Sequence, residues 1–182
     1  EMCIRDRMKV WIRADGNEQI GTGHVMRCLA IAEALEAAGV PVCFVMADGA
    51  AAQLVKSRGK KARILHTRYD RMEEELPVLT AVMEAEHPDM LLIDSYYVSD
   101  AYLQQLTEQV WTVYIDDKSF RSYPVNMIIN YNIYGDRSLY HPEPAYSLMG
   151  AAYAPLRPEF RNVEYPVREQ AEAVLLTTGG SD

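Results

Sequence analysis

The residues that are best suited to a chemical role follow the first apolar run of the chain. Their sequence is Gly21-Thr-Gly-His24. Glycine lets a backbone turn sharply and approach a ligand closely. A histidine titrates near neutral pH, so His24 could take a proton from a water molecule. The segment precedes a helix expected over 24–38, whose first N–H groups suit an oxyanion such as phosphate. An ordinary strand-to-helix turn explains the pattern equally well, and the third glycine of a dinucleotide-binding turn is absent.

Polar residues also follow the other apolar runs. For each group alone, a helix cap, a turn or surface packing is the better explanation. The carboxyl ends of parallel strands meet at one edge of a sheet, where ligands bind, so their convergence favours a binding site. The groups are Arg13, Asp15 and the Gly21-Thr-Gly-His24 loop after the first run, Asp94-Ser-Tyr-Tyr97 after the fourth, Asp116-Asp-Lys118 after the fifth and Asn130-Tyr-Asn-Ile-Tyr134 after the sixth.

Apolar runs alternate with helical patterns along most of the chain. Strands are expected over 9–13, 41–46, 63–66, 90–93, 111–115, 127–130 and 174–177, and helices over 24–38, 50–57, 71–86 and 100–108. Pro77 should kink or divide the third helix. Residues 131–167 contain five prolines and are expected to form loops. The alternation predicts an α/β fold, a parallel sheet with helices on both faces.

Composition narrows the class of protein. The chain has 182 residues, of which 49% are hydrophobic and 24% charged, as expected for a soluble globular domain. Its net charge of -8 argues against a nucleic-acid partner, and no apolar run is long enough to span a membrane. The three cysteines have neither metal-ligand nor disulfide spacing, which favours a reducing cytoplasm. No metal or other cofactor is expected, and a monomer is expected.

The two ends depart from this pattern. Residues 1–7 precede the first clean strand and are interpreted as a non-native leader. Residues 8–168 then form one domain. Residues 169–182 combine an apolar run with a second glycine pair, and we expect them to begin a second domain that is truncated here.

Several motifs, taken together, resemble the PseG family, the UDP-2,4-diacetamido-2,4,6-trideoxy-β-L-altropyranose hydrolases of pseudaminic acid biosynthesis. The resemblance runs from Met8 to Asp182 and implies the N-terminal half of a GT-B-type fold, two Rossmann-like domains with a cleft between them. The motifs are Ile12-Arg-Ala-Asp15, Ile20-Gly-Thr-Gly-His-Val-Met-Arg27, Ile93-Asp-Ser-Tyr96, Ile115-Asp-Asp117, Asn130-Tyr-Asn-Ile-Tyr134, Tyr153-Ala-Pro-Leu-Arg-Pro-Glu-Phe160 and Thr178-Gly-Gly-Ser-Asp182.

The resemblance implies roles for individual residues. His24 would be the catalytic histidine, with Tyr96 beside it. The substrate-binding candidates are Arg13, Asp15, Gly21, Gly23, Arg27, Asp94 and Asn132, and the nucleotide-binding candidates are Gly179, Gly180 and Ser181.

The expected reaction is hydrolysis of a UDP-linked 2,4-diacetamido-2,4,6-trideoxy sugar to the free sugar and UDP. The helix dipole at His24 should lower the pKa of its imidazole and keep it in the base form. A GT-B glycosyltransferase and a non-catalytic nucleotide-sugar-binding fragment are the alternatives, because one fold serves several functions. Without a complete nucleotide-binding domain, the chain alone is expected to be inactive.

Overall fold

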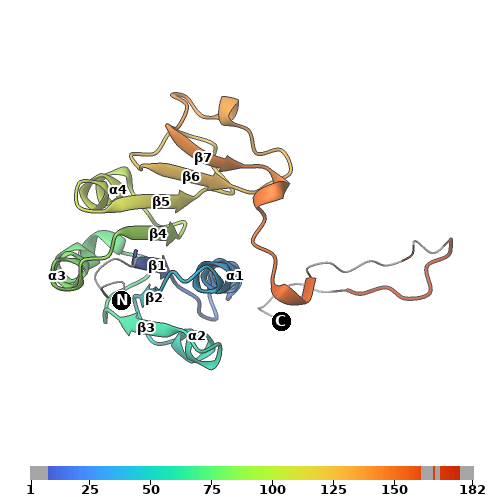
Figure 1. Cartoon of the computed structure of the whole chain (residues 1–182), viewed down its shortest axis with the longest axis horizontal. Helices are drawn as coiled ribbons and strands as arrows, with labels where there is room; N and C mark the ends of the chain where they lie inside the picture. The colour runs from blue at the N-terminus through green and yellow to red at the C-terminus, as the bar shows by residue number, and fades with distance from the viewer. Residues whose placement is uncertain (1–7, 161–165, 167–168, 177–182) are drawn as a thin grey trace.

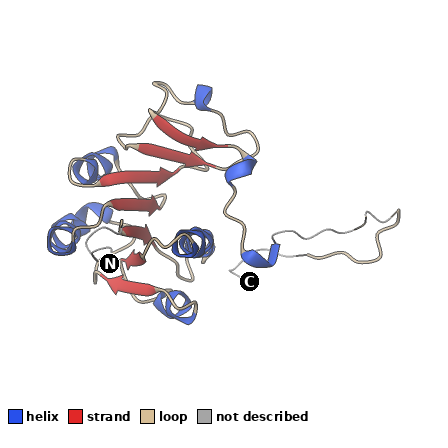
Figure 2. Cartoon of the chain, viewed as in Figure 1, coloured by secondary structure: helices blue, strands red, loops and turns tan. Residues whose placement is uncertain are grey.

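The structure is a computed structural model that describes residues 8–160, 166 and 169–176. Within these residues seven strands form one fully parallel sheet in the order β3-β2-β1-β4-β5-β6-β7 (Figure 1; Figure 2). The strands are β1 Val10–Ala14, β2 Val42–Met46, β3 Lys61–Ile64, β4 Met90–Asp94, β5 Trp111–Ile115, β6 Met127–Asn130 and β7 Tyr146–Met149.

The strand order reverses between β1 and β4. From β1 the chain proceeds outward to β2 and β3, and then returns to β4 on the other side of β1. In the register of this pair Ala14 lies beside Asp94, so the carboxyl ends of the two strands are level. The crevice outside such a reversal is where open α/β sheets bind ligands.

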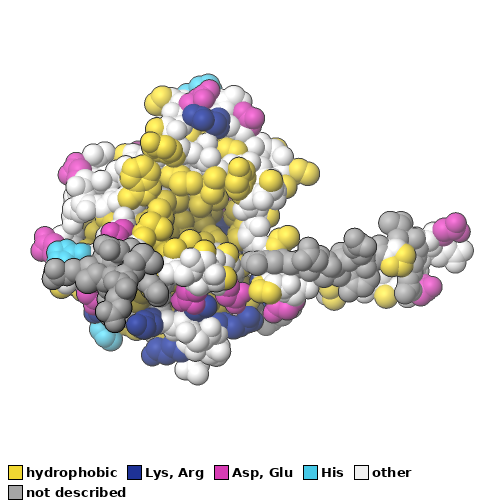
Figure 3. Space-filling view, viewed as in Figure 1, with side chains coloured by type: hydrophobic (Ala, Val, Ile, Leu, Met, Phe, Trp, Pro, Cys, Tyr) yellow, Lys and Arg dark blue, Asp and Glu magenta, His cyan; other side chains and the backbone are white. Residues whose placement is uncertain are grey.

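Helices cover both faces of the sheet, as the alternation in the sequence predicts. The apolar side chains of β1 divide between the faces, with Val10, Ile12 and Ala14 in one core and Trp11 in the other. Helices α1 (Gly23–Ala37) and α2 (Ala52–Ser57) pack on the first core, and α3 (Leu76–Glu86) and α4 (Asp100–Thr107) on the second. Figure 1 shows the two pairs on opposite sides of the sheet. Hydrophobic side chains also gather in Figure 3 over the position of β5 and β6.

Pro77 divides the segment expected as one helix over 71–86. A 3-10 helix, η2 (Met72–Glu75), precedes α3, and Pro77 lies in the first turn of α3. A proline is tolerated there because the first N–H groups of a helix have no intrahelical partner. The remaining 3-10 helices that the structure describes are η3 (Arg137–Leu139), η4 (Ala151–Tyr153) and η5 (Pro158–Phe160).

Two expectations about the later part of the chain are wrong. The segment 131–167 is not all loop, because β7 forms within it and pairs with β6. Residues 174–176, expected as most of a strand, have no regular structure, and their side chains are 88–90% exposed. Residue 177 lies outside the described residues. One edge of the sheet is therefore β7, a strand of four residues without an obvious alternation of apolar and polar side chains. Pro144 lies two residues before it.

No helix in the described residues is long and apolar enough to cross a membrane.

Candidate functional site

His24 lies in the first turn of α1, after a loop that is folded on itself. The side-chain oxygen of Asn17 accepts hydrogen bonds from the N–H groups of Gln19 and Ile20, and the Asn17 N–H donates to the carbonyl of Gly21. Gly21 has φ +68°, a conformation that favours glycine. Among the described residues no side chain caps the start of α1, so none of them binds its first N–H groups as a capping residue. The loop therefore presents His24 and a free helix N-terminus at the crevice.

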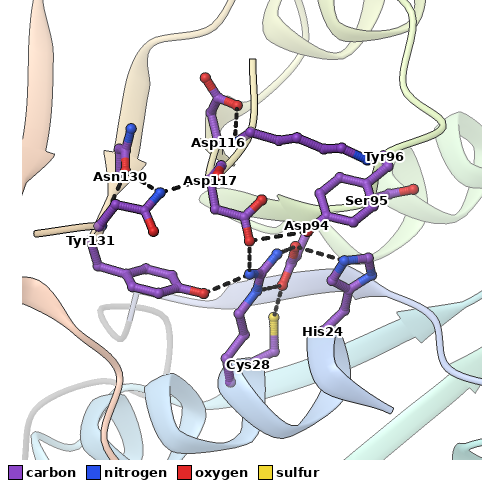
Figure 4. A network of polar contacts seen from close by, with 12 residues as sticks. His24, Cys28, Asp94, Ser95, Tyr96, Asp116, Asp117, Asn130 and Tyr131 are labelled. Atoms are coloured by element: carbon purple, nitrogen blue, oxygen red, sulfur yellow. Dashed lines mark hydrogen bonds and ion pairs between the residues drawn. The ribbon is translucent and has the colours of Figure 1, made fainter. Parts of the chain in front are cut away.

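Arg27, one turn further along α1, joins three other elements. Its Nε and Nη2 donate to the two oxygens of Asp94 at the end of β4, and its Nη1 donates to Asp117 after β5. The same Nη1 is 2.6 Å from the Tyr131 hydroxyl after β6. Figure 4 shows these side chains converging. The planar fork of a guanidinium matches a carboxylate on two atoms at once, so Arg27 fixes the relative placement of these elements.

Tyr96 lies beside His24, as the resemblance implies. The two rings meet edge to face, with centroids 4.6 Å apart and an interplanar angle of 81°. The Tyr96 hydroxyl donates to Asp117 Oδ2 at 3.1 Å, and Lys118 Nζ lies 4.6 Å from the centre of the tyrosine ring. The Nε2 atom of His24 is 4.0 Å from Asp94 Oδ1, which is too far for a hydrogen bond but close enough for charge to matter. Asp94, Tyr96 and His24 thus share one site.

The surroundings of His24 favour its neutral form. Burial lowers the pKa of the imidazole, and the nearby charge of Arg27 lowers it further, while Asp94 and Asp117 oppose the shift. The direction is the expected one, but burial, rather than the helix dipole, is its main cause.

Tyr96 and Asp117 are held in opposite protonation states. Burial and the hydrogen bond to Asp117 raise the pKa of Tyr96 to about 12, so its phenol is protonated at neutral pH. Burial acts to raise the pKa of Asp117 as well, but the hydrogen bond and the charge of Arg27 outweigh it and lower that pKa.

Arg13 and Asp15, both expected to bind substrate, lie in a separate buried cluster, and the charge of Asp15 still acts on His24. The Arg13 side chain is fully buried, and its Nε and Nη2 each donate over 2.7 Å to Glu75, while Nη1 donates to Asp15. Asp15 also accepts a 2.8 Å hydrogen bond from the N–H of Ala47. The Tyr102 hydroxyl completes the cluster with a 2.7 Å bond to Glu75. These contacts leave the Arg13 guanidinium no exposed surface, so it joins β1 to the start of α3 instead.

The remaining expected residues lie in different places. Asn132 is near the site, but its Nδ2 donates to the Asp117 carbonyl at 3.1 Å and to Asn130 Oδ1 at 3.0 Å, so it supports the loop. Gly21 shapes the turn before His24, and a Cβ at Gly23 would meet no heavy atom within 4 Å. Gly179, Gly180 and Ser181 lie outside the described residues.

Asp117 was not among the candidates, although its motif was noted. It follows Asp116, whose carboxylate accepts hydrogen bonds from the N–H groups of Lys118, Ser119 and Phe120. Asp116 thus forms the turn and Asp117 is free to reach the site. The signal in the sequence was the pair of aspartates directly after a buried strand, which did not reveal which of the two faces His24.

Comparison with known proteins supports the resemblance. No family model matches the chain. It is 27% identical over 180 residues to the UDP-2,4-diacetamido-2,4,6-trideoxy-beta-L-altropyranose hydrolase of Campylobacter jejuni, and the match covers 96% of this chain. The chain spans 61% of the length of that relative.

A solved structure supports the fold. MurG of Acinetobacter baumannii, a GT-B protein, superposes with a TM-score of 0.52 at 13% identity, over 68% of this chain and 41% of MurG. This likeness concerns the fold alone. The chain therefore resembles the PseG family along nearly its whole length, and it has the Rossmann-like architecture of one half of a GT-B protein.

Proposed function

We propose that this chain supplies the water-activating part of a hydrolase that releases a free sugar and UDP from a UDP-linked 2,4-diacetamido-2,4,6-trideoxy sugar. The match to the C. jejuni hydrolase supports this substrate class. The observation that carries the proposal is the placement of the His24 imidazole, in contact with Tyr96 and 4.0 Å from Asp94, at the carboxyl edge of the sheet.

The reaction needs a base, and His24 is suited to that role. Water adds to the anomeric carbon, the bond from that carbon to the diphosphate oxygen breaks, and its electron pair leaves with UDP. The neutral imidazole takes the proton of the water, and burial keeps the imidazole neutral near pH 7. The Asp94 carboxylate, 4.0 Å away, stabilises the imidazolium that forms. The Tyr96 phenol remains protonated, and its hydroxyl proton is donated to Asp117.

The charges near His24 favour a sugar over a diphosphate at this edge. Figure 4 shows three carboxylates here, those of Asp94, Asp116 and Asp117, and the cations that the described contacts place beside them are Arg27 and Lys118. The Arg27 guanidinium is already bound by two of the carboxylates. A diphosphate here would face an excess of negative charge. In our proposal the diphosphate is held instead by the nucleotide part that the resemblance implies, which includes residues 179–181 and a helix N-terminus of its own.

The test is an assay without an acceptor. A polypeptide of the relative's full length that contains this chain is incubated with the UDP-linked diacetamido sugar, and UDP and free sugar are quantified. We expect both products in equal amounts. Product that forms only when a second sugar or alcohol is added would favour the glycosyltransferase and contradict hydrolysis. UDP-sugar binding with no turnover in either case would indicate a binding protein.

The residue-level test is His24→Ala. We expect turnover to fall by about 100-fold or more, as for loss of a general base. The matched control is His66→Asn, which removes an exposed histidine with φ 60°, a backbone conformation that asparagine adopts readily. A folded His24→Ala protein with near-normal turnover would refute the assignment.

A further inference from the structure

We propose that Asp117 is a positioning residue for the reaction, which holds Tyr96 against the His24 imidazole and fixes the Arg27–Asp94 pair beside it. The inference rests on the proposed role of His24 as the base. Asp117 is not among the site residues expected from the sequence, and the likeness to known proteins gives it no role.

The first argument concerns Tyr96. Its side chain is only partly buried, with the residue 47% exposed, so packing alone does not fix the ring. Its hydroxyl donates to Asp117 Oδ2 at 3.1 Å, and its ring then meets the His24 ring edge to face. Asp117 therefore anchors the far end of the ring that contacts the imidazole.

The second argument concerns Arg27. The same Asp117 Oδ2 accepts from Arg27 Nη1, while Nε and Nη2 of Arg27 bind both oxygens of Asp94. A guanidinium is planar and rigid, so holding one of its edges orients the other. Asp117 thereby contributes to the placement of Asp94, whose Oδ1 lies 4.0 Å from His24 Nε2.

The third argument concerns the cost of a carboxylate at this place. Asp117 Oδ1 is buried and accepts no hydrogen bond from any residue that the structure describes. A buried polar atom without a partner destabilises a fold. The other oxygen of this carboxylate, Oδ2, accepts hydrogen bonds from Arg27 and from Tyr96. Fold stability is thus a poor explanation for an aspartate here, and its two contacts through Oδ2 are a better one.

Two substitutions separate the hydrogen bonds of Asp117 from its charge. In Asp117→Asn the amide oxygen can still accept from both Tyr96 and Arg27, whereas Asp117→Ala removes both bonds. We expect Asp117→Ala to lower kcat by about 10-fold or more, with KM within about threefold, because misplaced groups lose rate. Asp117→Asn should retain most of the activity. Equal losses in both variants would contradict positioning through hydrogen bonds.

The pH profile gives a second readout. The charges that face His24 are Arg27 on α1, Asp94 at the end of β4, Asp15 after β1 and Asp117 after β5. Since the negative charge of Asp117 raises the pKa of His24, removing it should move the acid limb of kcat/KM to lower pH in Asp117→Asn. An unmoved limb would contradict the contact.

A measurement without substrate keeps the proposal separate from the proposed function. The imidazole signals of His24 are followed by NMR titration of this chain, with the exposed Asp70→Asn as the control. We expect the His24 pKa to fall in both Asp117 variants, and the ring-current shift from Tyr96 to disappear only in Asp117→Ala. If that variant does not fold, an unchanged His24 titration in Asp117→Asn would still overturn the proposal. Absence of hydrolysis in the unaltered protein would instead contradict the proposed function.

Discussion

Arg27→Met should be strongly destabilising, because it leaves two carboxylates at the site without their cation. Asp94 is fully buried, and among the described residues it would keep the Cys28 thiol, whose sulfur lies 3.5 Å from Oδ2, and the His24 imidazole, 4.0 Å from Oδ1. Asp117 would keep the Tyr96 hydroxyl. Removing one partner of a buried ion pair typically costs about 3–5 kcal/mol. At about 2–4 °C per kcal/mol for a chain of this size, the melting temperature should fall by roughly 6–20 °C.

The assay is urea unfolding followed by far-UV circular dichroism. The control is Arg71→Met, since the pair of Arg71 with Glu74 is exposed on both sides and should be worth less than about 1 kcal/mol. Adding Asp94→Asn to Arg27→Met should recover part of the loss, because the amide removes the uncompensated charge. A loss below about 1 kcal/mol for Arg27→Met, or strictly additive effects in the double variant, would refute this reasoning.

Two further predictions concern pH and the glycine loop. Burial lowers the pKa of His24 in the folded state below its ordinary value of 6.5. Near and below pH 6.5 the unfolded chain therefore binds more protons at His24 than the folded chain does. The free energy of unfolding should therefore fall as pH is lowered from 7 to 5, and His24→Gln should flatten this slope; an unchanged slope would contradict burial as the cause. Gly21→Ala should cost about 1–2 kcal/mol in urea unfolding because φ is +68°, whereas Gly23→Ala should be nearly neutral, since its Cβ meets open space. Equal effects of the two substitutions would contradict the described loop.

The parallel sheet could be predicted from the sequence because most of its first six strands are apolar runs and helical patterns separate the first five. β4, with the sequence Met-Leu-Leu-Ile-Asp, is one such run, as expected for a strand covered on both faces. β7 was missed for the opposite reason. Its sequence Tyr-Ser-Leu-Met is short and has no clear alternation, and it forms because β6 offers a free edge. The expected strand over 174–177 had a good local pattern, but residues 174–176 have no neighbouring strand in the structure. Local pattern therefore predicted strands only where the sheet also supplied a partner.

The same distinction explains which site residues could be found from the sequence. The closeness of His24 and Asp94 could be predicted because each directly follows a recognisable turn or strand, and topology brings such positions to one edge. The difference between Arg13 and Arg27 could not be found in this way, because both are arginines near that edge with acidic residues available to them. It depends on Glu75, which lies 62 residues from Arg13 in the chain and binds its guanidinium in the core. Arg27 instead binds the carboxylates that face His24. The role of a buried arginine thus depends on which acidic residue the fold brings to its guanidinium. The two partners lie far apart in the sequence.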